Sequence, residues 1–301
     1  MRKSMLLACV LGLVLAAGVF AQAFSVDYLD GTVELKIPKD KAGKLWKLLA
    51  IGDTVASDAS LRVGPGSSIE LARGRVRITI LKPGIYMVAD LSKAKEKASV
   101  AAIGPALSQK LTAMTTDKPR TDSAVGGVRG AEQGTSTRSV EWIEENDEVR
   151  AKVADYMASG KYKDAVDELT QAIPEAATDE EESERQYMLA AAYYGNGEAL
   201  RAYRTVAKAS PDPKAEYYPR FVLLKAQILV DSLDFREALA LLKPLIAAGQ
   251  AGETAQMAYL LAAVSQKGLG DETSARTSLN AGYAIDPSTE TAELISAQLG
   301  K

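Results

Sequence analysis

The sequence contains no histidine and a single cysteine, Cys9, among 301 residues. Without histidine there is no Ser-His or Cys-His dyad, no histidine-ligated zinc and no imidazole base near neutral pH. The 36 basic residues are balanced by 39 acidic ones, so the basic excess typical of a duplex-binding surface is absent. These absences argue against an enzyme and against a nucleic-acid-binding protein. We expect no catalytic residues, no cofactor and no metal.

The first 23 residues have the organisation of a secretory signal peptide. A basic start precedes an apolar run from Met5 to Phe20, and Ala21 and Ala23 stand at the −3 and −1 positions of a cleavage site. We predict cleavage after Ala23 and a periplasmic or secreted location. An uncleaved membrane anchor and lipidation at Cys9 are the alternatives. Cleavage after Ala23 removes the only cysteine, so the mature chain would depend on ordinary burial for its stability.

Residues 24–91 alternate apolar and polar side chains with a period of two, which is typical of strands. The clearest examples are VELKI at 33–37, IEL at 69–71 and RVRITI at 75–80. Turn residues separate them at 30–31, 52–53, 64–66 and 82–84. We predict a small antiparallel sandwich or barrel, with Glu70 on a polar strand face. We interpret Arg75 and Arg77 as part of a solvated face rather than as an anion site.

Five short motifs follow one another in this region: Gly31-Thr32-Val33, Trp46 with Leu48, Gly52-Asp53, Leu61-Arg62-Val63-Gly64 and Ser67-Ser68-Ile69-Glu70-Leu71. Their order and spacing resemble the FecR domain, over roughly residues 28–86. FecR domains are periplasmic all-β modules of bacterial envelope proteins. The resemblance therefore implies an all-β fold for residues 24–91 and a place in the cell envelope.

Residues 92–140 are predicted to form a helix followed by a linker. The sequence favours helix up to Ile103, and Gly104-Pro105 should break it. Beyond the break, Leu107, Leu111 and Met114 are spaced i, i+4 and i+7. This spacing places them on one side of a helix, so we expect this stripe to pack on a neighbouring element.

The stretch SAVGGVRGAEQG at 123–134 invites comparison with phosphate-binding loops. A Walker loop requires lysine directly after its last glycine, but Ala131 follows Gly130 here. The spacing of a dinucleotide-binding loop is also absent. Residues 124–132 instead resemble the phrase AV-x-x-VRGTE, which follows the β region of many FecR-type proteins. We predict that this stretch is the joint between two binding modules.

From Trp142 onward the sequence has helical periodicity and repeats itself. The equivalent alanines Ala165, Ala202, Ala238 and Ala275 are 37, 36 and 37 residues apart. A constant period of this length indicates stacked helical units rather than one globular core. The aligned turn positions are 160, 197, 233 and 270, and the acidic run at 179–182 stands where a helix should begin.

This pattern resembles tetratricopeptide repeats, in which each unit is a helix–turn–helix with a small residue at the helix crossing. The predicted units are 146–178, 183–215, 219–251 and 256–288, within a domain of residues 141–301, and 289–299 would be a capping helix. The predicted fold class is thus α+β multidomain, a small all-β N-terminal domain followed by an all-α superhelix.

The resemblance implies a groove lined by the first helix of each unit. The residues predicted to bind a partner there are Arg150, Met157, Tyr187, Ala191, Tyr194, Arg220, Leu223, Gln227, Leu260, Val264 and Lys267. Such a surface suits an extended or helical protein segment with apolar anchors. We therefore expect an envelope adaptor or scaffold that binds another protein. The alternative is a cell-wall or glycan-binding module that uses Tyr28, Trp46 and Tyr86 of the β domain.

Overall fold

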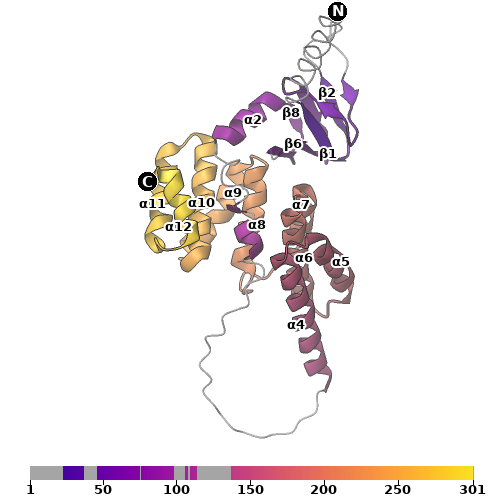
Figure 1. Ribbon diagram of the computed structural model, residues 1–301, viewed down its shortest axis with the longest axis vertical. Helices are drawn as coiled ribbons and strands as arrows, with labels where there is room; N and C mark the ends of the chain where they lie inside the picture. Colours follow the sequence, from indigo (N-terminus) through magenta and orange to yellow (C-terminus); the bar gives the residue numbers. More distant parts are fainter. Residues whose placement is uncertain are drawn as a thin grey trace, which may run out of the picture.

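The computed structural model describes residues 23–36, 46–74, 76–97, 106–107, 109–113 and 137–300, with side chains from residue 148 onward in the last range. Antiparallel sheets at the N-terminal side are followed by a helical region that extends to Leu299 (Figure 1). The predicted α+β layout is confirmed at this level. The predicted signal peptide, Ile37, Arg75, Met114 and the stretch 123–134 lie outside the described residues, apart from Ala23.

Among the described residues, the β domain forms two four-stranded sheets. The first sheet has the order β4 (Thr54–Val55), β1 (Phe24–Asp30), β6 (Ser68–Arg73), β7 (Val76–Ile80), and the second has the order β3 (Lys47–Leu48), β2 (Val33–Lys36), β5 (Ser60–Val63), β8 (Gly84–Met87). All neighbouring strands are antiparallel. Buried side chains of both sheets, including Phe24, Leu61 and Ile69, form one hydrophobic cluster. The two sheets therefore share one core.

The first sheet is buried on both of its faces, not only on the face that packs in this core. This corrects the prediction that Glu70 lies on a polar, solvated strand face. In β6 the four consecutive residues Ser68–Leu71 are all buried, and Glu70 is 2% exposed. Alternate side chains of a strand point to opposite faces, so a strand buried at every position is covered on both. The second cover is the helical region, whose helix α7 (Ala199–Lys208) contacts β6.

The helical region extends from Thr137 to Leu299. Its helices are α4 (Thr137–Ala158), α5 (Tyr162–Ala172), α6 (Asp179–Gly195), α7, α8 (Tyr218–Asp231), α9 (Phe235–Ala247), α10 (Gly252–Leu269), α11 (Glu272–Ile285) and α12 (Glu290–Leu299). A short 3-10 turn, η1 (Ile173–Glu175), follows α5, and α2 (Val88–Lys97) follows the β domain. Each helix from α4 to α12 contacts the next, and α10 also contacts α8 and α12.

The four aligned turn positions share one backbone conformation. Gly160, Gly197 and Gly270 have φ values of 69°, 79° and 86°, and Leu233 has a φ of 62°. This left-handed region is comfortable for glycine and strained for leucine. Leu233 departs from the glycine of the other three units, yet the backbone turns there as it does in those units.

Two aromatic–glycine contacts recur at equivalent places in the helical region. A Cβ atom on Gly195 would lie 2.5 Å from the ring of Tyr162, and one on Gly268 would lie 2.4 Å from the ring of Phe235. Glycine is required at both positions because an aromatic ring on one helix packs directly against the backbone of the helix that follows it. The two contacts are separated by two repeat periods, which is consistent with the predicted repetition.

The acidic run at 179–182 begins helix α6, as predicted. Thr178 is the N-cap, and its hydroxyl accepts a hydrogen bond from the backbone N–H of Glu181 at 3.1 Å. The Glu181 carboxylate in turn accepts from the backbone N–H of Ala177 at 2.9 Å. Free N–H groups and the helix dipole both favour carboxylates at this end of a helix.

Candidate functional site

Most of the residues predicted to bind a partner lie inside the molecule. Seven belong to the hydrophobic cluster of the helical region: Met157, Tyr187, Ala191, Tyr194, Leu223, Leu260 and Val264. Gln227 is also fully buried. The structure therefore brings these residues together across α4, α6, α8 and α10, but packs them against this chain itself. In this conformation they are not available for direct contact with a partner.

The buried aromatic residues among them make specific contacts. The Tyr187 ring stacks on Tyr217, with ring centroids 5.7 Å apart and an interplanar angle of 18°, and meets Phe221 edge-on at 6.3 Å. The Tyr194 hydroxyl donates a hydrogen bond to Asp231, which also accepts from Gln227 at 3.1 Å. These contacts join α6 to α8 and account for the burial of the tyrosines.

The three charged members of the predicted set are more accessible. Arg150 forms an ion pair with Glu184 of α6. The Lys267 ammonium is 3.3 Å from the Gln298 amide oxygen of α12. Arg220, near the start of α8, is half-buried. These three side chains remain the members of the set that a partner could reach without displacing part of the chain.

A short piece of the chain between the two domains packs on the helical region. Residues 106–107 and 109–113, called the 106–113 segment below, are helical. Leu107 and Leu111 are 1% and 3% exposed and belong to the same cluster as the predicted partner-binding residues. The prediction that the stripe at Leu107 and Leu111 packs on a neighbour is confirmed. The neighbour is the helical region.

A lysine of this segment is held by two carboxylates from different helices. The Lys110 ammonium lies 2.7 Å from Glu253, in the first turn of α10, and 2.6 Å from Glu290, in the first turn of α12. The Thr291 hydroxyl donates to Glu253 at 2.9 Å. Burial opposes the charge on Lys110, but the two carboxylates outweigh it and raise the pKa of Lys110 above its ordinary value. The segment is therefore anchored by apolar and ionic contacts together.

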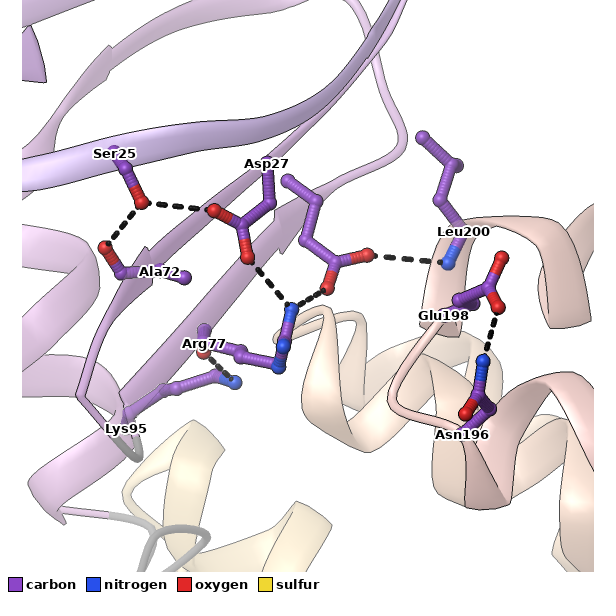
Figure 2. A network of polar contacts seen from close by, with 9 residues as sticks. Ser25, Asp27, Ala72, Arg77, Lys95, Asn196, Glu198 and Leu200 are labelled. Atoms are coloured by element: carbon purple, nitrogen blue, oxygen red, sulfur yellow. Dashed lines mark hydrogen bonds and ion pairs between the residues drawn. The ribbon is translucent and has the colours of Figure 1, made fainter. Parts of the chain in front are cut away.

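The first sheet meets helix α7 through the buried carboxylate of Glu70, which bonds to the Arg77 and Leu200 labelled in Figure 2. One Glu70 oxygen accepts from Arg77 at 2.7 Å, and the other accepts from the backbone N–H of Leu200 at 3.4 Å. Arg77 also donates to Asp27 at 3.1 Å. Leu200 lies in the first turn of α7, where the N-cap residue Glu198 makes no capping hydrogen bond through its side chain. Glu70 thus satisfies an N–H group at a helix start that belongs to the other domain.

The environment of Glu70 is unusual for a carboxylate. Burial is the largest influence and raises the pKa of Glu70, although Arg77 and the Leu200 N–H act against it. Both oxygens already accept hydrogen bonds, so the geometry suits an interdomain contact rather than proton transfer to a substrate.

Arg204, one turn further along α7, reaches the same sheet. Its guanidinium forms an ion pair with Asp30, donates to the Tyr28 hydroxyl at 3.1 Å and lies over the Tyr28 ring at 5.6 Å. Positions 200 and 204 are one turn apart, so Leu200 and Arg204 lie on the same side of α7. This side of α7 is the one that covers the first sheet.

Two lysines extend the contact to other helices. Lys95 of α2 is buried and donates to the backbone carbonyl of Arg77, and burial lowers the pKa of Lys95 (Figure 2). Lys82, just before β8, forms ion pairs with Asp234 and Glu237 at the start of α9. The β domain therefore contacts the starts of α7 and α9, which follow the turns at 197 and 233.

The aromatic residues considered for glycan binding are already engaged. Arg62 lies over the Trp46 ring at 4.6 Å, and the Tyr86 hydroxyl donates to the Lys82 carbonyl at 2.9 Å. Tyr28 is covered by Arg204. The second sheet instead exposes aliphatic side chains, with Leu48 64% and Ile85 67% exposed. An open aromatic platform for stacking sugars is not found among residues 23–36, 46–74 and 76–97.

Comparison with known proteins finds no matching family model, no similar curated protein and no similar solved structure. In the part of the chain that the structure describes, no helix combines the length and apolarity needed to cross a membrane. That same part holds no group of three or more acidic or cysteine side chains placed to bind a metal ion.

Sequence reasoning missed the interdomain residues Glu70, Lys82, Lys95 and Arg204. Glu70, Lys95 and Arg204 are charged residues in ordinary strand or helical patterns and Lys82 stands in a turn, and such positions are usually solvated. A weak signal was present at Glu70, because a carboxylate between Ile69 and Leu71 in a strand needs a partner if that strand is covered on both faces.

Proposed function

We propose that this protein is an adaptor of the bacterial cell envelope that binds another envelope protein non-covalently through its helical region. In this proposal the β domain is FecR-like and the helices are tetratricopeptide-like repeats. The N-terminal sequence would direct the chain to the periplasm or the exterior. The β domain would fix the position of the helical region instead of acting as a separate binding module.

The observation that carries the proposal is the packing of the 106–113 segment on the helical region. The helical region holds a short amphipathic helix by two leucines and one lysine, which is the mode in which helical repeats and grooves recognise protein segments. The residues of that surface are aliphatic, aromatic and carboxylate groups. They suit a polypeptide better than a small polar ligand.

Site-specific photo-crosslinking in the native envelope tests this proposal. A photoreactive amino acid would replace Arg150 or Lys267, the accessible members of the predicted set at opposite ends of the helical region. We expect a covalent adduct with the same envelope protein from both positions. The purified partner should then bind the full chain, and Lys267→Glu should weaken that binding.

The matched control places the photoreactive residue at Lys47, which is exposed on β3 of the second sheet. Equal adducts from Lys47 and from the helical positions would contradict recognition through the helical region. Adducts from Lys47 alone would assign binding to the β domain.

A further inference from the structure

The 106–113 segment has the features of a recognition sequence. Leu107 and Leu111 are four residues apart, so a helix places them on one side. Lys110 precedes the second leucine and points to a different part of the surface, where it meets Glu253 and Glu290. Two apolar anchors and one cation, each with its own site, are enough to fix both the position and the direction of a helix.

The receiving surface is built from separate elements. Glu253 comes from α10 and Glu290 from α12, and Thr291 donates to Glu253, which holds that carboxylate in place. The leucines enter the hydrophobic cluster that spans α4 to α12. The Lys110 side chain is 17% exposed, whereas Glu253 and Glu290 are 34% and 80% exposed, so the site favours a cation because two carboxylates act on one largely buried ammonium.

We propose that this surface is the docking site for a helical segment of the protein partner, and that the 106–113 segment occupies it until the partner displaces it. The partner segment would carry two aliphatic side chains four residues apart and a lysine or arginine directly before the second. This inference rests on the proposed function and deepens it, since it names the chemistry of the partner and a built-in competitor.

The alternative occupant, the same segment of a second copy, is at a disadvantage. The 106–113 segment is connected to α4 by the 23 residues 114–136. The segment and its site thus belong to one chain, so this docking is intramolecular, whereas a second copy must bind at its own micromolar concentration. A partner helix that makes the same contacts and adds others can overcome this, whereas an identical segment cannot.

A labelled peptide of residues 105–116 (PALSQKLTAMTT) tests the inference by fluorescence anisotropy with full-length chains. The Leu107→Ser/Leu111→Ser chain, in which the site is vacated, should bind the peptide about 100-fold more tightly than the wild-type chain. The Lys110→Glu chain keeps both leucines, so its affinity for the peptide should lie between those of the wild-type and vacated chains. A peptide that carries Lys110→Glu should bind the vacated chain about 10-fold more weakly. Adding Glu253→Lys and Glu290→Lys to the vacated chain should reverse that preference.

The control chain carries Lys152→Glu, which removes a different lysine–carboxylate pair of the helical region, with Glu168. It should bind the peptide as weakly as the wild type. The inference is overturned if the vacated chain keeps its helical circular dichroism but does not bind the peptide, or if it binds both peptides equally. A dimer formed by exchange of the segment would also overturn it. If the vacated chain does not fold, the Lys110→Glu chain decides: it must bind the peptide at least several-fold more tightly than wild type.

The peptide titration needs no partner protein, so its result is independent of the crosslinking experiment. Crosslinking to one envelope protein without peptide binding would support the adaptor and reject this docking site. Peptide binding without any crosslinked protein would support the site and count against the adaptor.

Discussion

Two of the contacts that the helical region makes with other described parts of the chain differ in character. The β domain meets α7 and the start of α9 through charged groups: Glu70, Asp30 and Lys82 of the β domain, with Arg204 of α7 as the partner of Asp30. The 106–113 segment inserts two leucines into the hydrophobic cluster and adds a single ion-paired lysine. The first contact depends on close pairing of charges, and the second depends mainly on apolar burial.

The two contacts therefore differ in what they contribute: one fixes the relative orientation of the domains, and the other stabilises their association. A buried ionic group costs desolvation energy that its partners largely offset, so the net stabilisation is small while the geometry is strict. Burial of a leucine side chain contributes about 1.5–3 kcal/mol and requires no directional partner. We infer that the β domain contact orients the two domains, whereas the 106–113 contact supplies more of the free energy that holds them together.

The largest expected effect comes from breaking the apolar contact. Leu111→Ala should lower the free energy of unfolding by about 2–5 kcal/mol, because it removes buried methyl groups and leaves a cavity. Urea denaturation followed by circular dichroism measures this. Leu48→Ala, on the outer face of the second sheet, is the matched control because Leu48 is 64% exposed, and it should change the stability by about 0.5 kcal/mol or less. A similar loss of unfolding free energy in both variants would contradict the inference that the 106–113 contact stabilises the chain through apolar burial.

The two contacts also differ in how far the sequence can predict them. The spacing of Leu107 and Leu111 along the chain is enough to indicate a packed helix, because the apolar period is a local signal. The helix pairs, their turns and the start of α6 follow from local patterns in the same way. Local signals cannot identify which surface receives the leucines.

The β domain contact is beyond prediction for a clear reason. One Glu70 oxygen accepts a hydrogen bond from Leu200, 130 residues further along the chain, and the sequence around residue 70 shows only a carboxylate between two apolar residues, not that α7 covers the strand. The predicted partner-binding set is affected similarly. The repeat register correctly places most of these residues together. It could not show that neighbouring helices and the 106–113 segment bury them.

The second prediction concerns the pH dependence that the buried Glu70 introduces. Its pKa in the folded protein is raised above the ordinary value of about 4.3, so the folded state binds this proton more tightly than the unfolded state. Glu70 therefore favours folding most at low pH, and this contribution is lost as the pH rises from about 4.3 through the raised pKa. Relative to Glu70→Gln, the wild type should therefore lose stability across that range.

Glu34 provides the control of opposite sign. It lies on β2 of the second sheet, where the hydrogen bond from Arg62 lowers the pKa of Glu34. Its contribution is present above its unfolded pKa and is lost as the pH falls through the lowered one, so Glu34→Gln should remove a slope of the other direction. Urea denaturation at several pH values measures both variants. A wild-type curve parallel to that of Glu70→Gln would show that Glu70 does not titrate differently on folding.

The smallest effect is expected at Lys82, the exposed end of the charged contact. Its side chain is 56% exposed, so solvent screens its ion pairs with Asp234 and Glu237. Lys82→Met should lower the stability by about 0.2–1 kcal/mol at low ionic strength. The loss should disappear near 1 M salt, where the Debye length falls to about 3 Å. Lys47→Met on β3, measured at both salt concentrations, is the control. A loss at Lys82 that persists in high salt would mean that its aliphatic stem, not its charge, holds the β domain to α9.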